Sequence, residues 1–298
     1  MGTTIRGRGV RRSSAALALL SGLFLVVACS VALPRLSRGT GVPVRVQLKP
    51  PSTGPAPTPA RAQAVIPPGR LLVHVPILEY HYIRVNPDPR DQLGFNLSVT
   101  PTNFKAQMSW LSAHHYHAID LADLRAYFAG QVYLPSRPVV LTFDDGYEDF
   151  YATAWPILLA LGLRGVSYVV PGFLGRRGYM TAAQVGQLDR AGIEIGSHTV
   201  HHVDLTRADP LTLRIELEAS KGDLERLLGH PVLDLCYPSG RFDQAVEAAV
   251  AAAGYQSATT EQPGTSHSWA DRLAWTRVRV AGGEQLPAFG ASLGPSDT

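Results

Sequence analysis

The chain has 298 residues, of which 45% are hydrophobic, with 27 basic and 24 acidic side chains and a formal net charge of +3. The first 70 residues carry ten of the basic residues and none of the acidic ones, which leaves the remainder with a net charge of −7. This acidic remainder argues against nucleic acid as its partner. With only two cysteines, Cys29 and Cys236, the fold has no disulfide framework.

Residues 1–39 have the features of a membrane-addressed segment. Four arginines between residues 6 and 12 precede an apolar run over 15–33, which is long enough to span a bilayer as a helix. The run contains Val26-Val-Ala-Cys29, which resembles a bacterial lipobox with Cys29 as the lipidated residue. A signal peptide, a signal anchor and a lipoprotein signal all stay open. We expect an extracytoplasmic protein, anchored to the membrane at the cell surface.

Residues 40–70 are rich in proline and small polar residues. Such a segment cannot bury enough apolar surface to fold, so it is predicted to be an extended linker, and its basic charge suits an anionic membrane or wall. Residues 71–298 then form one domain, large enough for a single substantial core.

Strand-like and helix-like segments alternate through this domain. Short apolar runs predict strands at 71–78, 139–143, 165–170, 193–196, 232–236, 256–258 and 278–280. Longer periodic segments predict helices at 101–114, 149–161, 181–191, 211–228 and 243–253. The repeated order of strand and helix implies an α/β fold with parallel strands, arranged as an open sheet or as a barrel.

The strand over 139–143 ends in two adjacent carboxylates, Asp144 and Asp145, followed by Gly146. Its apolar run predicts a strand buried on both faces, so the carboxylates lie at its carboxyl end, where α/β proteins bind ligands. Neighbouring carboxylates repel each other unless a cation neutralises one or a pKa rises. The pair therefore indicates a metal site or a perturbed acid, although Asp-Asp-Gly is also common turn chemistry.

Three histidines follow the predicted strand over 193–196. His198 and His202 are four residues apart, so in a helical turn both rings project from one face and can hold one ion. His201 competes with them for this role. Together with one aspartate, the cluster forms a His-His-carboxylate set that leaves positions open for water and substrate, as catalytic zinc and iron sites do.

Two segments carry a family resemblance. Thr142-Phe-Asp-Asp-Gly146 and His198-Thr-Val-His-His202 resemble the first two motifs of the polysaccharide deacetylases, the NodB-homology domain of carbohydrate esterase family 4. The resemblance implies the distorted (β/α) barrel of that family.

The same resemblance implies a role for each residue of these two motifs. Asp144 is the implied catalytic base, and Asp145, His198 and His202 are the implied ligands of a divalent metal, which we expect to be zinc. His201 falls on a variable position.

The family's third motif, Arg-x-Pro-Tyr/Phe, corresponds to 236–240 and differs from it at two positions. Cys236 stands where the family has the arginine that orients the base, and Arg277 or Arg279 is the expected replacement. We select Arg277, because Arg279 fits an ordinary solvated charge on the same strand. Ser239 can keep the family's oxyanion contact through its backbone N–H. The two residues before Ser239, Tyr237 and Pro238, are assigned to substrate binding.

The family's last motif, Leu-x-His near the C-terminus, has no counterpart in the C-terminal stretch. The segment 75–82 resembles the Tyr-His segment of the extracellular poly-N-acetylglucosamine deacetylase branch, in which the N-terminal side supplies this strand. His81 is therefore the candidate acid that protonates the departing amine.

The residues and the resemblance together predict a metal-dependent hydrolase that removes N-acetyl groups from an extracellular polysaccharide containing N-acetylglucosamine. Hydrolysis of O-acetyl esters is the nearest alternative. A noncatalytic glycan-binding surface protein is the alternative from another class, because the third and last motifs depart from the family pattern.

Overall fold

The computed structural model describes Gly2 and residues 72–294. Apart from Gly2, the predicted membrane segment over 1–39 and the linker over 40–70 lie outside the described residues. Within the described part of the chain, no helix is both long and apolar enough to cross a membrane.

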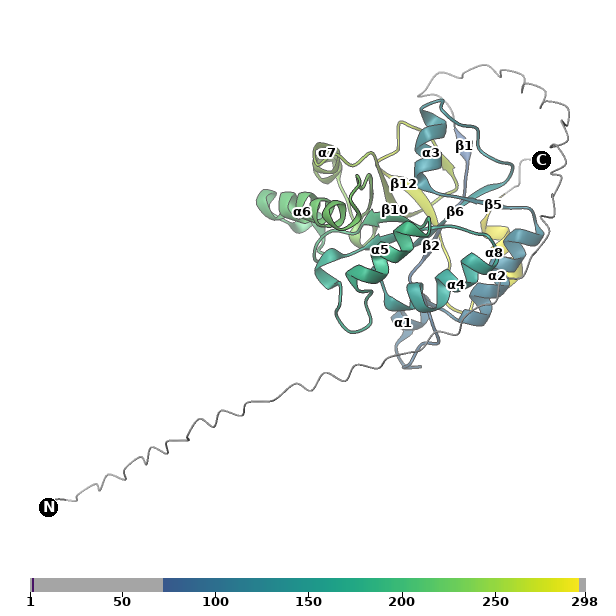
Figure 1. Ribbon diagram of the computed structural model, residues 1–298, viewed down its shortest axis with the longest axis horizontal. Helices are drawn as coiled ribbons and strands as arrows, with labels where there is room; N and C mark the ends of the chain where they lie inside the picture. The colour runs from purple at the N-terminus through teal and green to yellow at the C-terminus, as the bar shows by residue number, and fades with distance from the viewer. Residues whose placement is uncertain (1, 3–71, 295–298) are drawn as a thin grey trace, which may run out of the picture. The chain divides into compact units, whose positions relative to one another are not determined.

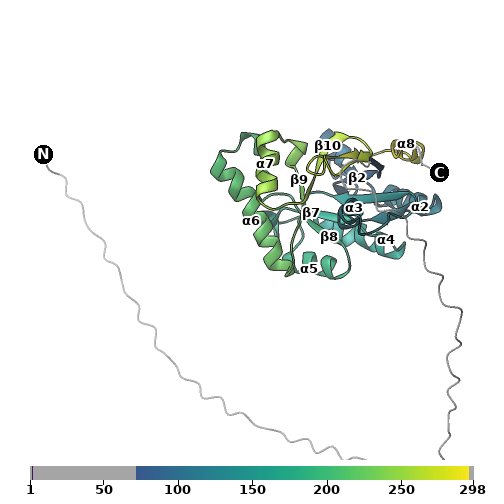
Figure 2. The ribbon, with the colours of Figure 1, turned by 90° about the horizontal axis from the view of Figure 1, so that it is seen from above.

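Within residues 72–294, seven parallel strands close into a barrel (Figures 1 and 2). In their order around the barrel they are β2 (Ile77–Tyr80), β12 (Trp275–Arg279), β10 (Ser257–Pro263), β9 (Asp234–Cys236), β8 (Glu194–Ser197), β7 (Val166–Val169) and β6 (Pro138–Phe143). Pairing of β2 with β6 closes the ring, with Tyr80 opposite Phe143. The barrel expected from the family resemblance is confirmed.

The helices and several short strands surround the ring without belonging to it. β5 (His117–Ile119) pairs with the first half of β6, on the edge opposite β2. The remaining short strands are β1 (Val73–His74), β3 (Tyr82–Ile83), β4 (Ser98–Val99) and β11 (Ser266–His267). The helices are α1 (Gln92–Leu97), α2 (Pro101–Ala113), α3 (Leu121–Phe128), α4 (Trp155–Ala160), α5 (Ala182–Arg190), α6 (Pro210–Leu228), α7 (Gln244–Ala252) and α8 (Leu286–Ser292).

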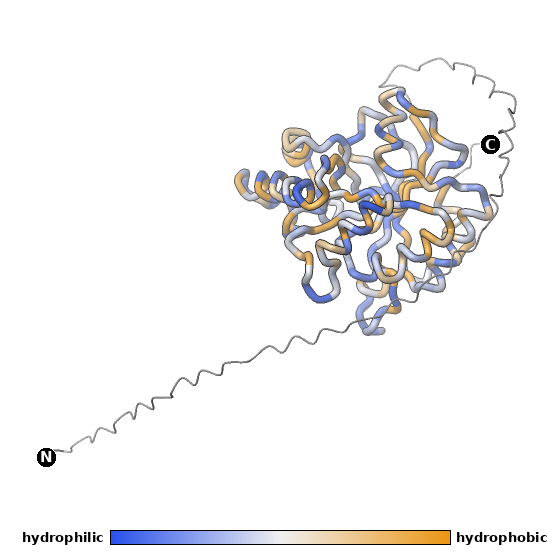
Figure 3. The backbone as a smooth tube through the Cα atoms, in the orientation of Figure 1, coloured by the Kyte–Doolittle hydropathy of each residue, from blue (hydrophilic) through white to orange (hydrophobic). Residues whose placement is uncertain are grey.

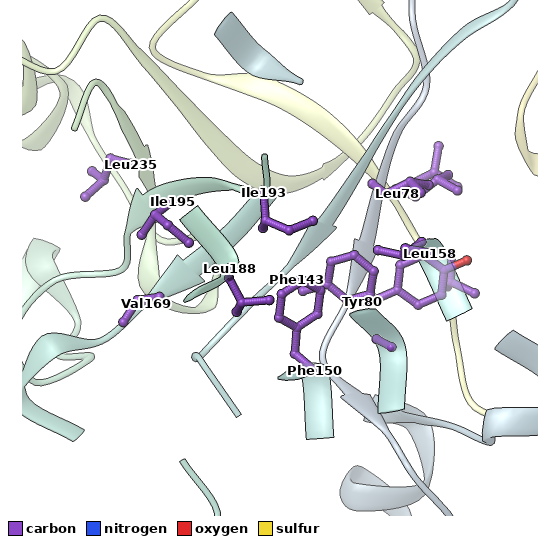
Figure 4. Packing of buried hydrophobic residues seen from close by; sticks show 14 of the residues in the cluster. Leu78, Tyr80, Phe143, Phe150, Leu158, Val169, Leu188, Ile193, Ile195 and Leu235 are labelled. Atoms are coloured by element: carbon purple, nitrogen blue, oxygen red, sulfur yellow. The ribbon is translucent and has the colours of Figure 1, made fainter. Parts of the chain in front are cut away.

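Alternating side chains of the strands build two hydrophobic clusters. One set, which includes Leu78, Tyr80 and Phe143, packs outward against helices, and Figure 4 shows it at close range. The other set, which includes Ile77 and Trp275, fills the barrel together with residues of α3. This alternation follows from the two-residue period of a strand. It also decides which polar residues further along each strand face the inside.

Local sequence signals account for the longest helix, α6. The Asp209 side chain accepts hydrogen bonds from the N–H groups of Leu211 and Thr212, Pro210 occupies the first turn, and Gly229 ends the helix in a left-handed conformation. Hydrophobic and hydrophilic residues alternate along its turns in Figure 3, as expected for a helix with one buried face.

The strands and helices predicted from periodicity are all present, with shifted ends. The predicted strand over 71–78 is divided between β1 and β2, and the predicted helix over 149–161 begins as the π-helical turn η1 (Phe150–Ala154) before α4. Periodicity missed α1, α3, α8 and β5, which are short elements that depend on packing against the barrel.

Candidate active site

A cavity of about 340 Å³ lies at the carboxyl ends of the barrel strands. Ligands of α/β barrels bind at this end, because the loops that follow the strands gather there. The residues that line the cavity are His81, Leu93, Leu97, Asp145, Tyr147, Phe173, Tyr179, His198, His202, Ser239, Glu261 and Arg279.

Asp144 follows β6 and is held by a buried arginine from β12. Nη1 and Nη2 of Arg277 each donate to one carboxylate oxygen of Asp144, both at 2.8 Å. Arg277 also donates to Thr142 Oγ1 and to the carbonyl of Thr260, so its guanidinium is held in one orientation. Burial opposes ionisation, but the Arg277 charge outweighs it and holds the pKa of Asp144 well below the usual range for an aspartate.

Cys236, at the end of β9, completes the surroundings of this pair. Its Sγ lies 3.5 Å from Asp144 Oδ2 and 3.3 Å from Arg277 Nη2. Burial raises the pKa of the thiol well above its usual range, so it stays neutral. Arg277 therefore makes from β12 the contact that the family arginine would make from position 236. Arg279 differs: its side chain is 39% exposed and pairs with Glu79 and Glu261.

Asp145 turns away from Asp144 because the backbone changes conformation between them. Asp145 and Gly146 both have positive φ, at 72° and 73°, which is a left-handed region that few residues other than glycine adopt. One carboxylate thus points to Arg277, while Oδ1 of the other lies 3.5 Å from His198 Nε2 and 3.4 Å from His202 Nε2.

The loop after β8, not a helical turn, brings His198 and His202 together. The expectation of a helical turn is wrong, because Thr199 and His202 both have positive φ, at 63° and 55°. Such a backbone is costly for a β-branched residue such as Thr199 and is often found at functional sites. The Thr199 hydroxyl accepts the N–H of His202 at 3.0 Å, which stabilises the turn.

His198 is prepared to act as a ligand through Nε2. Its Nδ1 lies 2.8 Å from the carbonyl of Cys236, so the proton of the neutral ring belongs on Nδ1. Burial lowers the pKa of His198 to about 4, so the ring is neutral at physiological pH. The ligand atoms of Asp145, His198 and His202 all lie within 4.8 Å of one another, as a common metal ion requires.

Two other groups of side chains meet the same distance condition, namely Asp144–His198–Cys236 and Glu79–His81–Glu261. In both groups an arginine already neutralises the carboxylates: Arg277 pairs with Asp144, and Arg279 pairs with Glu79 and Glu261. Asp145 faces two imidazoles instead. The set of Asp145, His198 and His202 is therefore the one suited to a cation.

His201 points away from this set. Its Nδ1 lies 2.7 Å from Glu216 Oε1 on α6, and 55% of its side chain is exposed. The other Glu216 oxygen accepts the N–H groups of Val200 and His201, both at 2.9 Å. His201 therefore fixes the loop to α6.

His81 follows β2 and lies between two carboxylates. Its Nε2 is 3.9 Å from Asp144 Oδ2, and its Nδ1 is 3.9 Å from Glu79 Oε1. The structure thus brings His81 beside the proposed base, as the pairing of β2 with β6 requires. Sequence reasoning missed Glu79, although its position two residues before His81 on a strand puts both on the inner face.

The third motif forms the turn η4 (Pro238–Gly240), and only some of its residues reach the cavity. Ser239, with a positive φ of 54°, lines the cavity. Contrary to the expected contact with substrate, Tyr237 is fully buried, donates its hydroxyl to the carbonyl of Leu273 at 2.9 Å and stacks on Phe242. Pro238 is also buried. Neither lines the cavity, so these two residues support the turn that presents Ser239.

Comparisons with known proteins show which family the chain is similar to. A family model described as polysaccharide deacetylase matches residues 131–258. A relative from Bacillus subtilis (strain 168), named "Putative polysaccharide deacetylase YxkH", is 30% identical over 219 residues, which are 74% of this chain and 76% of that protein. The poly-beta-1,6-N-acetyl-D-glucosamine N-deacetylase of Escherichia coli (strain K12) is 41% identical over 64 residues, 22% of this chain and only 10% of that protein.

Among solved structures, the Streptococcus pyogenes deacetylase PplD in complex with acetate superposes with a TM-score of 0.70 at 28% identity, covering 76% of this chain and all of that one. BC0361, a polysaccharide deacetylase from Bacillus cereus, superposes with a TM-score of 0.66 at 28% identity, covering 74% of this chain and 69% of that one. The length of the match to the Bacillus subtilis relative and these structural similarities show that the chain belongs to the polysaccharide deacetylase family of hydrolases.

Proposed function

We propose that this protein is a metal-dependent N-deacetylase of a cell-surface polysaccharide that contains N-acetylglucosamine. One observation supports it above the others. A His-His-Asp set suited to a cation adjoins an aspartate that a buried arginine keeps ionised, and both lie at the end of the barrel where ligands bind.

Asp145, His198 and His202 would hold the metal. The donor set of two imidazoles and one carboxylate, with the His198 tautomer fixed by the Cys236 carbonyl, suits zinc. A divalent ion bound there polarises an acetamide carbonyl and lowers the pKa of bound water to about 7.

The chain's own residues supply the proton transfers. Asp144 is the base, since Arg277 keeps it ionised, and it accepts the proton of the attacking water. His81, 3.9 Å from Asp144, gives a proton to the departing amine, which is too basic to leave without one. The Ser239 N–H is the proposed partner of the oxyanion.

The substrate and the location rest on different support. Several relatives are named poly-beta-1,6-N-acetyl-D-glucosamine N-deacetylases, which favours an N-acetylglucosamine polymer. A location outside the cytoplasm, with an anchor in the membrane or a lipid on Cys29, rests on the sequence of residues 1–39.

Acetate release from a panel of polymers tests the proposal. Full-length protein is incubated with poly-N-acetylglucosamine, peptidoglycan, chitin oligomers and acetylxylan, with and without a chelator. We expect release from at least one N-acetylated polymer, loss with the chelator and recovery on addition of zinc. Release from acetylxylan alone would indicate an O-acetyl esterase, and binding without release would indicate a glycan-binding protein. Release that resists chelation would remove the metal from the proposal.

A further inference from the structure

Glu216 of α6 is a buried carboxylate that the proposed chemistry does not use. Only 3% of the residue is exposed. Among the residues that the structure describes, its ion-pair partner is the imidazole of His201, and no lysine or arginine pairs with it. Burial of a carboxylate is costly unless hydrogen bonds or a cation compensate for the lost hydration. The hydrogen bonds to Glu216 must therefore supply that compensation.

In the described part of the chain, the donors to Glu216 all belong to the histidine loop, residues 198–202, which carries two of the proposed metal ligands. Oε2 accepts the N–H groups of Val200 and His201, both at 2.9 Å, and Oε1 lies 2.7 Å from Nδ1 of His201. Two successive N–H groups reach one carboxylate oxygen only while the backbone keeps this turn. The carboxylate and the conformation of the loop thus stabilise each other.

Ser220 gives α6 a second contact with this part of the chain. It lies one helical turn after Glu216 and therefore on the same face of α6. Its Oγ lies 2.9 Å from Oγ of Ser197, the residue before the histidine loop, and Ser197 Oγ accepts the N–H of Thr199 at 3.4 Å. The hydroxyl of Tyr255 lies 3.1 Å from Ser220 Oγ and supports it from the other side. Helix α6 therefore holds the loop at its start and at its middle.

The histidine loop needs this support because its backbone is strained. Thr199 and His202, which both have positive φ, flank the two residues whose N–H groups Glu216 accepts. Without Glu216, the loop can relax toward ordinary backbone angles, and Nε2 of His202 would leave its place 3.4 Å from Asp145 Oδ1. A cation would then have to reorder the loop on binding, which weakens its affinity.

We propose that Glu216 is a positioning residue that sets the metal affinity of the site by holding the histidine loop in its ligand-binding conformation. The inference rests on the proposed function and deepens it, because it assigns part of the metal affinity to a residue that contacts no ligand atom of the metal set. The imidazole of His201 is not needed for this role, since both backbone N–H groups remain when it is removed.

Zinc titration of the metal-free, full-length protein in competition with a chelator tests the proposal. Wild type is compared with Glu216→Ala, Glu216→Asp and Glu216→Gln. The glutamine oxygen can still accept both N–H groups, whereas aspartate is one methylene shorter and does not reach them. Glu218→Ala is the matched control, because Glu218 is an exposed glutamate on the same helix that lines a different cavity. Melting temperatures of the metal-free proteins establish which variants are folded.

We expect Glu216→Ala and Glu216→Asp to bind zinc at least about tenfold more weakly than wild type, the usual effect of losing a group that orients a metal ligand. Glu216→Gln and Glu218→Ala should bind zinc as wild type does. Saturating zinc should restore the kcat of Glu216→Ala on an N-acetylated polymer, because the residue acts on the occupancy of the site and not on the proton transfers.

A purely structural role of Glu216 would lower the melting temperature and leave the zinc affinity of the folded protein unchanged. Wild-type affinity in folded Glu216→Ala would therefore overturn the proposal, and Glu216→Asp decides in the same way if the alanine variant does not fold. An equal loss in Glu216→Gln, or a kcat that stays low at saturating zinc, would also overturn it.

The titration needs no turnover, so it separates this inference from the proposed function. Weaker zinc binding by Glu216→Ala supports the positioning role even if no polymer releases acetate, a result that would contradict the proposed function alone. Unchanged zinc affinity together with acetate release overturns the positioning role and leaves the proposed function in place.

Discussion

Each end of the barrel contains a buried arginine between two carboxylates. At the amino end, Arg125 of α3 pairs with Glu194 and Asp234, the first residues of β8 and β9. Here the second Glu194 oxygen accepts the N–H groups of Leu121 and Ala122, at 2.7 and 3.2 Å, and Ser257 donates to Asp234. Backbone and hydroxyl donors thus supplement the arginine, and α3 covers the cluster.

At the carboxyl end, Arg277 lies between Asp144 and Glu79, but this cluster is not closed in the same way. Glu79 forms ion pairs with Arg277 and Arg279, but neither of its oxygens accepts a well-formed hydrogen bond, and burial raises the pKa of Glu79 despite these opposing charges. His81 lies beside both carboxylates and lines the cavity. A buried ion cluster is therefore not in itself a sign of catalysis. We expect catalysis at the cluster in which a buried carboxylate without a well-formed hydrogen bond lies next to a titratable side chain and a cavity.

The largest expected effect lies at the paired aspartates of the carboxyl end. Asp144→Asn should lose about 10³-fold or more in kcat on an N-acetylated polymer but keep its metal, because it removes the base and no ligand. Asp145→Asn should lose metal as well as activity. Metal content measured beside activity tests the assignment. If Asp144→Asn strips the metal while Asp145→Asn retains it, the two roles are exchanged.

Replacing the two arginines should separate stability from catalysis. Arg125→Met leaves Glu194 and Asp234 without their cation and should lower the free energy of unfolding by about 3–5 kcal/mol, as for other broken buried pairs. The kcat of the protein that remains folded should not change. Denaturant unfolding and active-site-normalised rates provide the two measurements.

Arg277→Met should instead change the pH dependence. Without the guanidinium, burial raises the pKa of Asp144, so the base becomes protonated at a higher pH. The acidic limb of the kcat/KM profile should therefore move upward by at least about one pH unit. In wild type, the pKa of Asp144 is lower in the folded state than in the unfolded state. This difference stabilises the fold at pH values above the unfolded-state pKa. The stabilisation is lost as the pH falls through the folded-state pKa. A variant with an unmoved acidic limb would contradict the role of Arg277.

His81→Ala tests whether the exposed side of the carboxyl-end cluster supplies the acid. We expect a loss of about 10²-fold on an amide substrate, because the sugar amine needs a proton to leave. Activity on an aryl acetate should persist, since a phenolate leaves without help, and metal content should not change. Equal losses on both substrates, or full amide activity, would exclude His81 as the acid.

The smallest effects should appear in the histidine loop. Alanine at His198 or His202 should weaken metal affinity by more than about tenfold. His201→Ala is the matched control, because it removes an imidazole from the same loop but one that contacts Glu216 instead of Asp145. It should bind metal as wild type does. Equal losses at His201 and His202, measured by metal titration, would reject this choice of ligands.

The sequence alone was sufficient to predict those parts of the site that depend on residues adjacent in the chain. The apolar run over 139–143 and the spacing of Asp144 and Asp145 locate the end of β6, and the histidine cluster locates the loop after β8. The backbone of that loop was not predictable, because tertiary contacts such as that of Glu216 with Val200 stabilise its left-handed residues.

Positions that depend on the register between strands were harder to predict. Arg277 and Arg279 alternate with apolar residues, and both therefore face the inside of the barrel. The two arginines differ in their depth within the barrel. Arg277 is buried and pairs with Asp144, while Arg279 lies opposite Glu79 at the rim. The residue pattern of one strand does not show how far that strand is shifted along its neighbours. The burial of Tyr237 was missed for the same reason, since its partner Leu273 belongs to a distant segment.

The closure of the barrel by β2 has a consequence for the order in which the site is completed. The proposed acid follows the first barrel strand in the sequence, the base follows β6, and Arg277 belongs to the last. β2 pairs with both β6 and β12, so its position is fixed only after the chain has been synthesised to about residue 279. A nascent or truncated chain that ends before β12 contains the ligand motifs yet lacks the cation beside Asp144. Hydrolytic competence should therefore appear late, when the two ends of the domain meet.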